Sequence, residues 1–342
     1  MILKSQKTDF KPIWNVRITL ISVLVLVLVV IAAISTGPVS LSTGEIFRTL
    51  FGLDGGLEGR EKTLLLEIRL PRVVLGALVG AALATSGAVY QTVFRNPLAD
   101  PYLLGTAAGA GLGATIAITT TNNSFSAALP IFAFIGGASA VAATFLVSGR
   151  YFSNPGVLLL SGIAVGAFAS AVQIYLQQRN TEVLRPVYSW ILGQLTVSDW
   201  NNVSWAALYI FFSLLILFRI SKLLDGLMLS DEEAFSLGVS PNKIRIIAVV
   251  AATLATATAV SVSGLIGFVG IIVPHIIKGI TRRVTNRALP TIAITGAAFL
   301  VLADLGARSL IAPAELPIGV ITAFIGAPFF LFVLRTTKGG LK

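Results

Sequence analysis

Stretches without a charged residue alternate with short polar segments along the chain, and they cover residues 18–44, 73–94, 101–149, 151–178, 200–218, 246–277, 288–303 and 316–334. Most of them reach the roughly 20 residues that a helix needs to cross a membrane. Two of them, 101–149 and 246–277, have room for two helices each. Asn122 and Asn123 mark a turn in the first, and the glycines of 264–270 mark a break in the second. The pattern therefore predicts about ten membrane helices.

The polar segments between these stretches are too short to fold alone, and the largest are 38–67, 177–199 and 222–245. The composition agrees with a membrane protein, because 55% of the residues are hydrophobic and 12% are charged. Soluble domains carry roughly 25% charged residues. We therefore expect an all-α membrane protein with a single transmembrane domain over residues 1–342.

The net charge of +10 is spread over short loops rather than gathered on one face, which disfavours nucleic-acid binding. If both chain ends lie inside, most lysines and arginines fall in inner segments, as the positive-inside rule requires. Trp14, Trp190 and Trp200 fall near predicted helix ends, where aromatic belts lie. We expect a multi-pass protein of the bacterial cytoplasmic (inner) membrane with both termini in the cytoplasm.

The chain lacks the residue groups that catalysis, metal binding or nucleotide binding would need. It has no cysteine, and its one histidine, His275, cannot build a metal site alone. Residues 59–63 lack the spacing of a G-x-x-x-x-G-K-[ST] phosphate-binding loop. No nucleophile is paired with a base within the apolar stretches, which disfavours a membrane-embedded enzyme. We expect no catalytic residue, no metal ligand and no cofactor in this chain.

Ionisable side chains are almost absent from the predicted membrane centre. Asp304, Arg308 and Glu315 fall near outer helix ends, and Arg95 and Asp100 fall near an inner end. Carriers that work alone usually couple transport to ions through intramembrane charged groups. An ion-coupled secondary carrier is therefore the disfavoured alternative class, and the energy for transport is expected to come from a separate ATPase subunit.

An inner segment, residues 223–241, predicts two short helical turns at the membrane face. Ser230 and Glu233 have the spacing of a capping box, which starts a short helix directly after Ser230. Gly238 is placed to end that helix. The Ser-Pro pair at 240–241 supplies the N-cap and first residue of the next one.

Three apolar side chains in the inner segment bear on its role. Phe235, Leu237 and Val239 are groups that an ordinary exposed loop would not need. From these residues alone, the inner segment is either a solvated connector or a docking element for a cytoplasmic partner.

Three arginines near outer helix ends form a second candidate site. Arg69 and Arg72 lie in the sequence RLPR, and Arg308 ends the sequence ADLGAR. The guanidinium fork binds carboxylates bidentately, so outward arginines are suited to docking an acidic partner. The alternative is that these side chains only extend to the membrane interface.

The last apolar stretch contains a local break at Gly326 and Pro328. Such a break loosens helical hydrogen bonding, and it can serve as a hinge or as a notch into which another helix packs. We expect packing, because breaks of this kind are commonly buried in membrane proteins.

Five segments together resemble the permease family of ABC importers for ferric siderophores, haem and cobalamin. They are RLPRVVLGALVGAALATSGAVYQTVFRNPLADPYLLG, LLLSGIAV, SGLIGFVGIIVPHI, ADLGAR and APAELPIGVITAFIGAPFF. The resemblance covers nearly the whole chain from about Glu67 to Arg335. It implies a permease of ten helices with type II ABC importer architecture.

The resemblance also implies partners and residue roles. The partners are a second permease copy (homodimer) or a paralogous permease, two cytoplasmic ATPase subunits that hold ATP and magnesium, and an extracytoplasmic substrate-binding protein. Arg69, Arg72 and Arg308 match the family's arginines that pair with acidic residues of the binding protein. The family's coupling helix, which sits in a groove of the ATPase, corresponds to Ser230, Asp231, Glu232, Glu233, Ala234, Phe235, Ser236, Leu237 and Gly238. Phe235 departs from the small residue usual in that loop.

The cargo that we expect is a ferric siderophore, with cobalamin and then haem as alternatives. A wide path lined by small and hydroxylated side chains suits any of these bulky molecules. The resemblance implies that the binding protein determines most of the selectivity for cargo in this family. The permease sequence therefore does not decide among the siderophore, cobalamin and haem.

Overall fold

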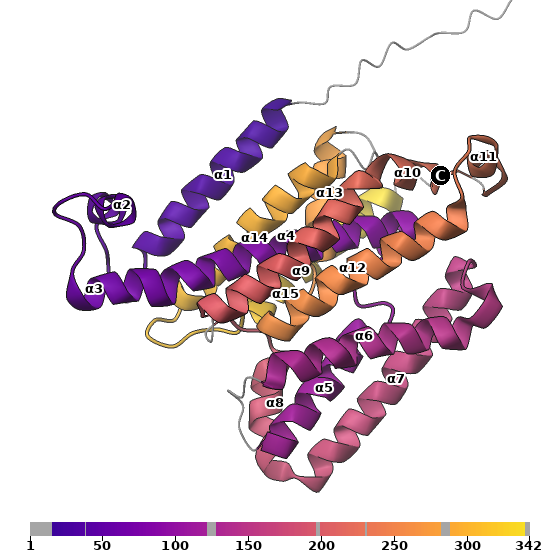
Figure 1. Cartoon of the computed structure of the whole chain (residues 1–342), viewed down its shortest axis with the longest axis horizontal. Coiled ribbons are helices and arrows are strands. Elements are labelled where there is room, and N and C mark those ends of the chain that lie inside the picture. The colour runs from indigo at the N-terminus through magenta and orange to yellow at the C-terminus, as the bar shows by residue number, and fades with distance from the viewer. Residues whose placement is uncertain are drawn as a thin grey trace, which may run out of the picture.

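The computed structural model describes residues 16–37, 39–121, 128–195, 199–229, 231–281 and 288–338. In these ranges the chain consists of helices joined by turns and loops, without a strand (Figure 1). The longer helices are α1 (Val16–Ser35), α4 (Leu70–Val93), α5 (Thr106–Thr121), α6 (Ala128–Ser148), α7 (Pro155–Arg179), α9 (Trp200–Arg219), α12 (Pro241–Ser263), α13 (Val269–Thr281), α14 (Leu289–Ser309) and α15 (Ile318–Lys338). The shorter ones are α2 (Thr43–Phe51), α3 (Gly59–Thr63), the π-helical turn η1 (Leu64–Arg69), the 3₁₀ turns η2 (Gly149–Tyr151) and η3 (Thr181–Val183), α8 (Leu184–Ile191), α10 (Ser221–Gly226) and α11 (Asp231–Ser236).

The ten predicted membrane helices correspond to the ten longer helices of the fold. Seven helices in the described part of the chain are long and apolar enough to cross a membrane. The remaining predicted crossings are α5, α13 and α15, and α13 has only 13 residues. The predicted break is confirmed, because α12 ends at Ser263 and α13 begins at Val269. Asn122 and Asn123 lie outside the described residues.

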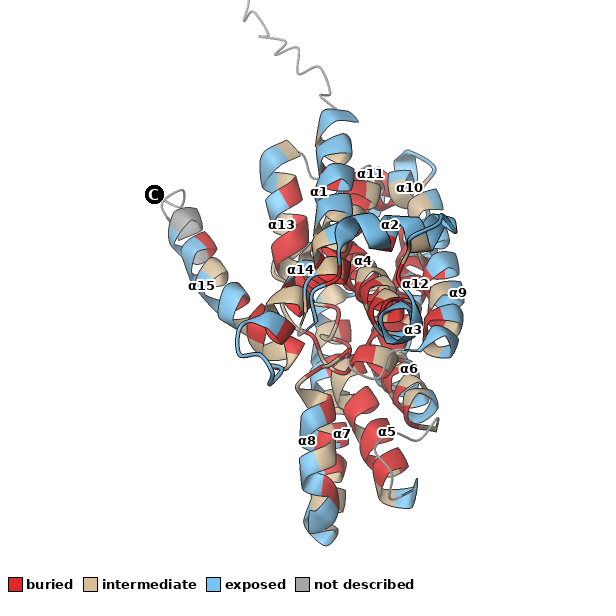
Figure 2. Cartoon of the chain, turned by 90° about the vertical axis from the view of Figure 1, so that its left-hand side faces the viewer, coloured by how far each residue is buried: buried red, intermediate tan, exposed pale blue. Residues whose placement is uncertain are grey.

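Two helices, α4 and α12, form the centre of the bundle. In the most apolar part of each, 78% and 72% of the residues are buried, against 17% in α1 and 28% in both α7 and α9. Figure 2 shows the same contrast, with red along α4 and pale blue along α1 and α9. The peripheral helices therefore carry the apolar surface that is available to lipid or to another membrane helix.

Glycines let α4 approach two of its neighbours closely. A Cβ atom added to Gly80 would lie 2.2 Å from the carbonyl oxygen of Gly296 on α14. One added to Gly87 would lie 2.0 Å from the carbonyl oxygen of Gly270 on α13. Because lipid tails compete equally for apolar side chains, close backbone packing of this kind is what holds membrane helices together.

The peripheral helix α1 is joined to α14 by hydroxyl groups at the level of its first turns. Thr19 and Thr291 share a hydrogen bond of 2.8 Å between their hydroxyls, and the Thr295 hydroxyl donates to that of Ser22 at 3.1 Å. Buried hydroxyl pairs of this kind contribute modestly in a membrane, on the order of 1 kcal/mol each.

The break in the last apolar stretch is a packing notch. The helix α15 continues through Pro328. A Cβ atom on Gly326 would lie 2.2 Å from Cγ of Phe268, so the glycine makes room for that aromatic ring. The ring belongs to a residue with a left-handed backbone, at a φ of 68°, in the break between α12 and α13.

The tryptophans divide between core and surface. Trp200 is 41% exposed at the start of α9, and its Nε1 donates to the Leu66 carbonyl at 2.9 Å, as suits the expected interfacial belt. The same expectation is wrong for Trp190, which is only 6% exposed and packs in a hydrophobic cluster with Val187 and Val260. Trp14 lies outside the described residues.

We predict that Gly296→Ala lowers the melting temperature of the purified protein in detergent. The added methyl group has no space against Gly80 and Ala84, and overpacking of this kind costs about 1–3 kcal/mol. The matched control is Gly306→Ala on the same helix, because a Cβ atom there meets nothing within 4 Å. Equal melting temperatures for the two variants would show that the α4–α14 contact is not as close as described.

Candidate coupling site and outer arginine cluster

The inner segment forms the short helix α11 between α10 and α12. Its end is confirmed at Gly238, whose φ of 79° is left-handed. The Gly238 N–H donates to the Phe235 carbonyl at 2.9 Å, and the Val239 N–H donates to that of Ala234 at 3.0 Å, which is a glycine-terminated helix end. The predicted cap residue Ser230 lies outside the described residues.

The start of the next helix, α12, is confirmed, with Pro241 as its first residue. Ser240 occupies the N-cap position with extended backbone, and its side chain makes no capping hydrogen bond. Proline at the first helical position needs no hydrogen-bond partner for its nitrogen, and its fixed φ suits a helix start. Proline alone is therefore sufficient to explain where α12 begins.

The surface of α11 and of the residues that follow it is largely exposed, and it combines apolar with acidic side chains. Phe235 is 73% exposed and Leu237 is 70% exposed, while Ala234 is buried against the bundle. The other residues of the predicted coupling helix that the structure describes, Asp231, Glu232, Glu233, Ser236 and Gly238, are exposed as well. An exposed aromatic and aliphatic pair beside carboxylates is typical of a protein interaction surface.

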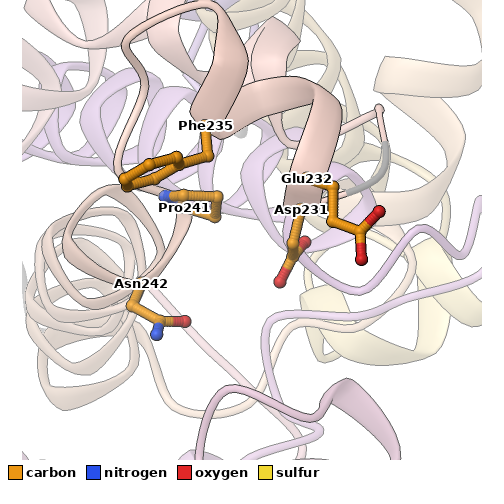
Figure 3. Close-up of a pocket in the computed structure, with 5 residues that line it drawn as sticks. All are labelled: Asp231, Glu232, Phe235, Pro241 and Asn242. Carbon is orange, nitrogen blue, oxygen red and sulfur yellow. The ribbon is translucent and has the colours of Figure 1, made fainter.

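An open depression of about 420 Å³ lies between α11 and the start of α12. Its lining residues are Asp231, Glu232, Phe235, Pro241 and Asn242 (Figure 3). Figure 3 shows the Phe235 ring beside Pro241 on one side, with the two carboxylates together on the other. The depression thus offers an apolar wall and an acidic wall to a partner.

Arg95 ties this surface to the membrane bundle. Its Nε donates to the Leu227 carbonyl at 2.7 Å, and its Nη2 donates to the Leu229 carbonyl at 2.6 Å and to Asp231 at 2.8 Å. Arg245 of α12 lies on the other side of the same carboxylate at 3.5 Å. Sequence reasoning had placed Arg95 at an inner helix end and given it no partner.

The turn that follows Arg95 is held by side-chain hydrogen bonds. The Asp100 side chain accepts from the Tyr102 N–H at 2.8 Å. The Tyr102 hydroxyl donates to the Ile266 carbonyl at 3.0 Å and accepts from the Ile266 N–H at 3.2 Å. Hydrogen bonds thus fix the segment 95–102 at both ends, to α11 through Arg95 and to the break between α12 and α13 through Tyr102.

At the other end of the bundle, Arg72 binds two carboxylates. Its Nη2 lies 2.8 Å from Asp304 and 2.9 Å from Glu315, and its Nε donates to Asp304 at 3.0 Å. The side chain of Arg72 is 12% exposed, that of Asp304 is 2% exposed, and that of Glu315 is 36% exposed. This bidentate pairing satisfies the fork of Arg72 within the chain.

Arg69 and Arg308 bind the end of α1 instead of facing outward. Arg69 donates from Nη1 to the Ile34 carbonyl at 2.7 Å and from Nη2 to that of Val39, and Arg308 donates from Nη1 to that of Thr36 at 2.9 Å. Arg308 also donates to the Ala33 carbonyl and lies 3.6 Å from Asp304.

Arg69 and Arg308 are therefore bonded within the chain in this structure, and their docking of a binding protein stays a prediction. They are 4% and 5% exposed, and their partners are the carbonyls that the last turn of a helix leaves without intrahelical bonds. We call Arg69, Arg72, Asp304, Arg308 and Glu315 the outer arginine cluster.

Neither site has the composition of a metal centre. In the ranges that the structure describes, no group of three or more His, Cys, Asp or Glu side chains is placed to hold a metal ion. His275 packs its ring edge-on against Phe329, with centroids 5.7 Å apart.

A bundle of apolar helices, with the two charged clusters just described at its opposite ends, is the architecture of a multi-pass membrane permease. The model of the FecCD transport family matches residues 24–336, and the chain belongs to that family. Family membership makes it a permease of an ABC transporter, a class of importer that also contains an ATPase and a binding protein.

Relatives and a solved structure agree with this assignment. A cobalamin import permease of Halobacterium salinarum is 39% identical over 83% of this chain and 76% of its own length. A ferric citrate import permease of Bacillus subtilis is 35% identical over 97% of this chain and 98% of its own length. An inward-facing metal-chelate type ABC transporter matches with a TM-score of 0.83 and 30% identity, over 93% of this chain and 99% of that one.

We predict that Asp304→Ala destabilises the protein in detergent by about 3–5 kcal/mol, because it leaves Arg72 and Arg308 buried without their shared carboxylate. The control is Glu315→Ala, which removes the more exposed partner of Arg72 and should cost less than about 1 kcal/mol. Thermal unfolding of both variants tests this. Similar losses for the two would mean that the buried carboxylate has no special role.

We also predict that Arg95→Ala speeds amide hydrogen exchange in residues 227–239 by about tenfold or more. Hydrogen bonds from a charged donor contribute about 1.5–3 kcal/mol, and each 1.4 kcal/mol changes an opening equilibrium tenfold. Lys243→Ala is the control, since it removes an exposed cation from α12 without breaking these bonds. Unchanged exchange in Arg95→Ala would show that this arginine does not fix the inner segment.

Proposed function

We propose that the chain is the permease subunit of an ATP-driven importer that carries a ferric siderophore inward. The observation that supports this most is the exposed apolar pair on α11, Phe235 and Leu237, in a chain of the FecCD transport family. A membrane protein has no reason to expose such groups to water unless a partner covers them.

The partner at α11 is a cytoplasmic ATPase, which supplies ATP and magnesium and does the hydrolysis. Its groove receives the two apolar side chains, and the carboxylates of Asp231 and Glu232 form the polar rim. Closure of two ATPase subunits moves α11, and nucleotide shifts the permease only by its differential affinity for the two conformations. The permease itself then needs no catalytic residue.

Motion at α11 reaches the membrane through polar bonds rather than through a loose loop. Asp231 is held by Arg95, and the turn after Arg95 is clasped to Ile266 by Tyr102. A displacement of α11 therefore acts on the break between α12 and α13. That break is where the chain can bend without losing helical hydrogen bonds.

At the outer face we keep the docking of a substrate-binding protein as part of the proposal. Arg72 and Glu315 are the members of the outer arginine cluster that a partner could reach. An acidic group of the binding protein would replace Glu315 on Arg72. In this arrangement Arg69 and Arg308 hold the docking face in shape and do not contact the partner.

A second copy of the permease, or a paralogous permease, completes the path. The helix α15 stands away from the bundle, with Phe324 74% exposed and Phe332 66% exposed (Figure 2). We propose that this helix packs on its partner and that the pair spans the bacterial inner membrane with the termini in the cytoplasm. The two copies together then enclose the path for a bulky chelate.

The cargo is the least constrained part of the proposal. Relatives are named as importers of ferric citrate and of cobalamin, which keeps both an iron chelate and a corrinoid open. We favour the ferric siderophore and hold cobalamin, then haem, as the alternatives. All three need the same wide path.

Reconstituted transport tests the proposal. The permease is placed in proteoliposomes with its ATPase and binding protein, and uptake of a ferric siderophore is compared with uptake of cobalamin. ATP-dependent uptake of the siderophore supports the whole proposal, and uptake of cobalamin corrects the cargo. Uptake by the permease alone, driven by an ion gradient, would identify an ion-coupled carrier and overturn it.

In the same assay we predict that Phe235→Asp with Leu237→Asp abolishes ATP-dependent uptake and detaches the ATPase. Two charges in place of a buried apolar contact cost several kcal/mol of binding, on the order of the loss of an interface hot spot. The matched control is Phe235→Leu with Leu237→Met, which keeps the surface apolar and should retain coupled uptake. Full transport by the charged variant would contradict the assignment of α11.

A further inference from the structure

The short helix α2 has a second exposed apolar surface, far along the chain from the coupling site. It is capped at its end by Gly52, whose φ is 66°, and it therefore stops after nine residues. Phe47, Leu50 and Phe51 are 55%, 46% and 66% exposed. The rings of Phe47 and Phe51 pack on each other with centroids 4.4 Å apart, so they form one continuous patch.

One side of α2 is fixed to the protein. Ile46 is 2% exposed and packs in a cluster with Ile34 of α1 and Leu65 of η1. The Thr49 hydroxyl accepts from the Leu57 N–H at 2.7 Å, which folds the following loop onto the same side. The helix is thus held in a definite orientation rather than attached by a free linker.

The remaining two sides of α2 are opposite in character. Each residue turns the helix by roughly 100°, so the apolar patch and the charged pair Glu45 and Arg48 point in directions roughly 135° apart. Ile46 and Thr49 form the third side, which faces the protein. The apolar patch and the charged pair therefore lie on two separate exposed sides of α2.

The position of α2 suits a helix that lies in the plane of a membrane. It lies beside the end of α1, and it is seen end-on in Figure 1 but lengthwise in Figure 2, so it crosses the long helices at a steep angle. The apolar part of α1 is only 17% buried, which leaves most of that helix available to lipid. The apolar patch of α2 thus belongs to a short helix next to the end of a helix whose surface is available to lipid.

We propose that α2 is an interfacial anchor whose Phe47, Leu50 and Phe51 side chains enter the outer boundary of the phospholipid bilayer. Amphipathic helices of this kind lie in the membrane plane with their apolar face about 5–10 Å into the headgroup and acyl boundary. The helix carries one Glu and one Arg and is therefore neutral, so its attachment depends on apolar burial and not on anionic lipids. Figure 2 places α15, the helix available to a second copy, on the other side of the bundle.

Spin-label accessibility in bilayers tests the anchor. The chain has no cysteine, so single cysteines can be introduced without altering a native one. We would label Phe51→Cys and Phe47→Cys in the permease alone, reconstituted in phosphatidylcholine vesicles, and measure collisions with oxygen and with a water-soluble nickel chelate. The controls are Leu24→Cys on the exposed face of α1, for lipid, and Glu45→Cys on the charged side of α2, for water.

The expected result is frequent collision with oxygen and rare collision with nickel at positions 47 and 51, as at position 24, with the reverse at position 45. A nickel accessibility at 47 and 51 equal to that at 45 would place the patch in water and overturn the proposal. Low accessibility to both reagents would place it against protein, such as a second copy, and would overturn the proposal equally. Neither result depends on transport, cargo or an ATPase.

Discussion

Backbone contact at glycines fixes the position of α4, and the two candidate sites lie at the two ends of that helix. Gly80 faces Gly296 of α14 and Gly87 faces Gly270 of α13, with no room for a side chain between them. In a bilayer this proximity replaces the hydrophobic effect as the reason for helices to associate. The outer arginine cluster begins where α4 begins, and Arg95 follows where it ends. The single helix α4 therefore connects the outer arginine cluster to the inner segment.

At both ends of the bundle, arginine side chains donate hydrogen bonds to backbone carbonyls near the end of a helix. Arg69 and Arg308 donate to carbonyls at the end of α1, and Arg95 donates to carbonyls just after α10. Carbonyls at a helix end lack intrahelical donors and carry partial negative charge, so a guanidinium satisfies them and is itself stabilised. Buried polar groups that would be costly without partners thus connect segments that are distant in the sequence.

The sequence predicted those features of the fold and of the candidate sites that depend on neighbouring residues, and it did not predict those that depend on distant ones. The helices follow from the length of apolar stretches, and the end of α11 follows from Gly238, since both depend on neighbouring residues. The partners of Arg69 and Arg308 could not be predicted. They are backbone carbonyls, which every residue has, and only the tertiary fold decides which of them an arginine can reach. Trp190 was misplaced for the same reason, since its burial depends on Val260, 70 positions away along the printed sequence.

The arginines at the end of α1 also bear on the order in which the molecule assembles. The acceptors at Ala33 and Thr36 leave the ribosome early, but their donor Arg308 follows 275 and 272 residues later. The hydroxyl partners of Thr19 and Ser22 are equally late, at separations of 272 and 273 residues. With a mean hydropathy of 3.1, α1 is stable in the lipid bilayer before these partners are synthesised. The contacts of α1 with α14 thus form long after α1 is synthesised, and a truncation before α14 would leave this helix inserted, with its end held by Arg69 but without those contacts.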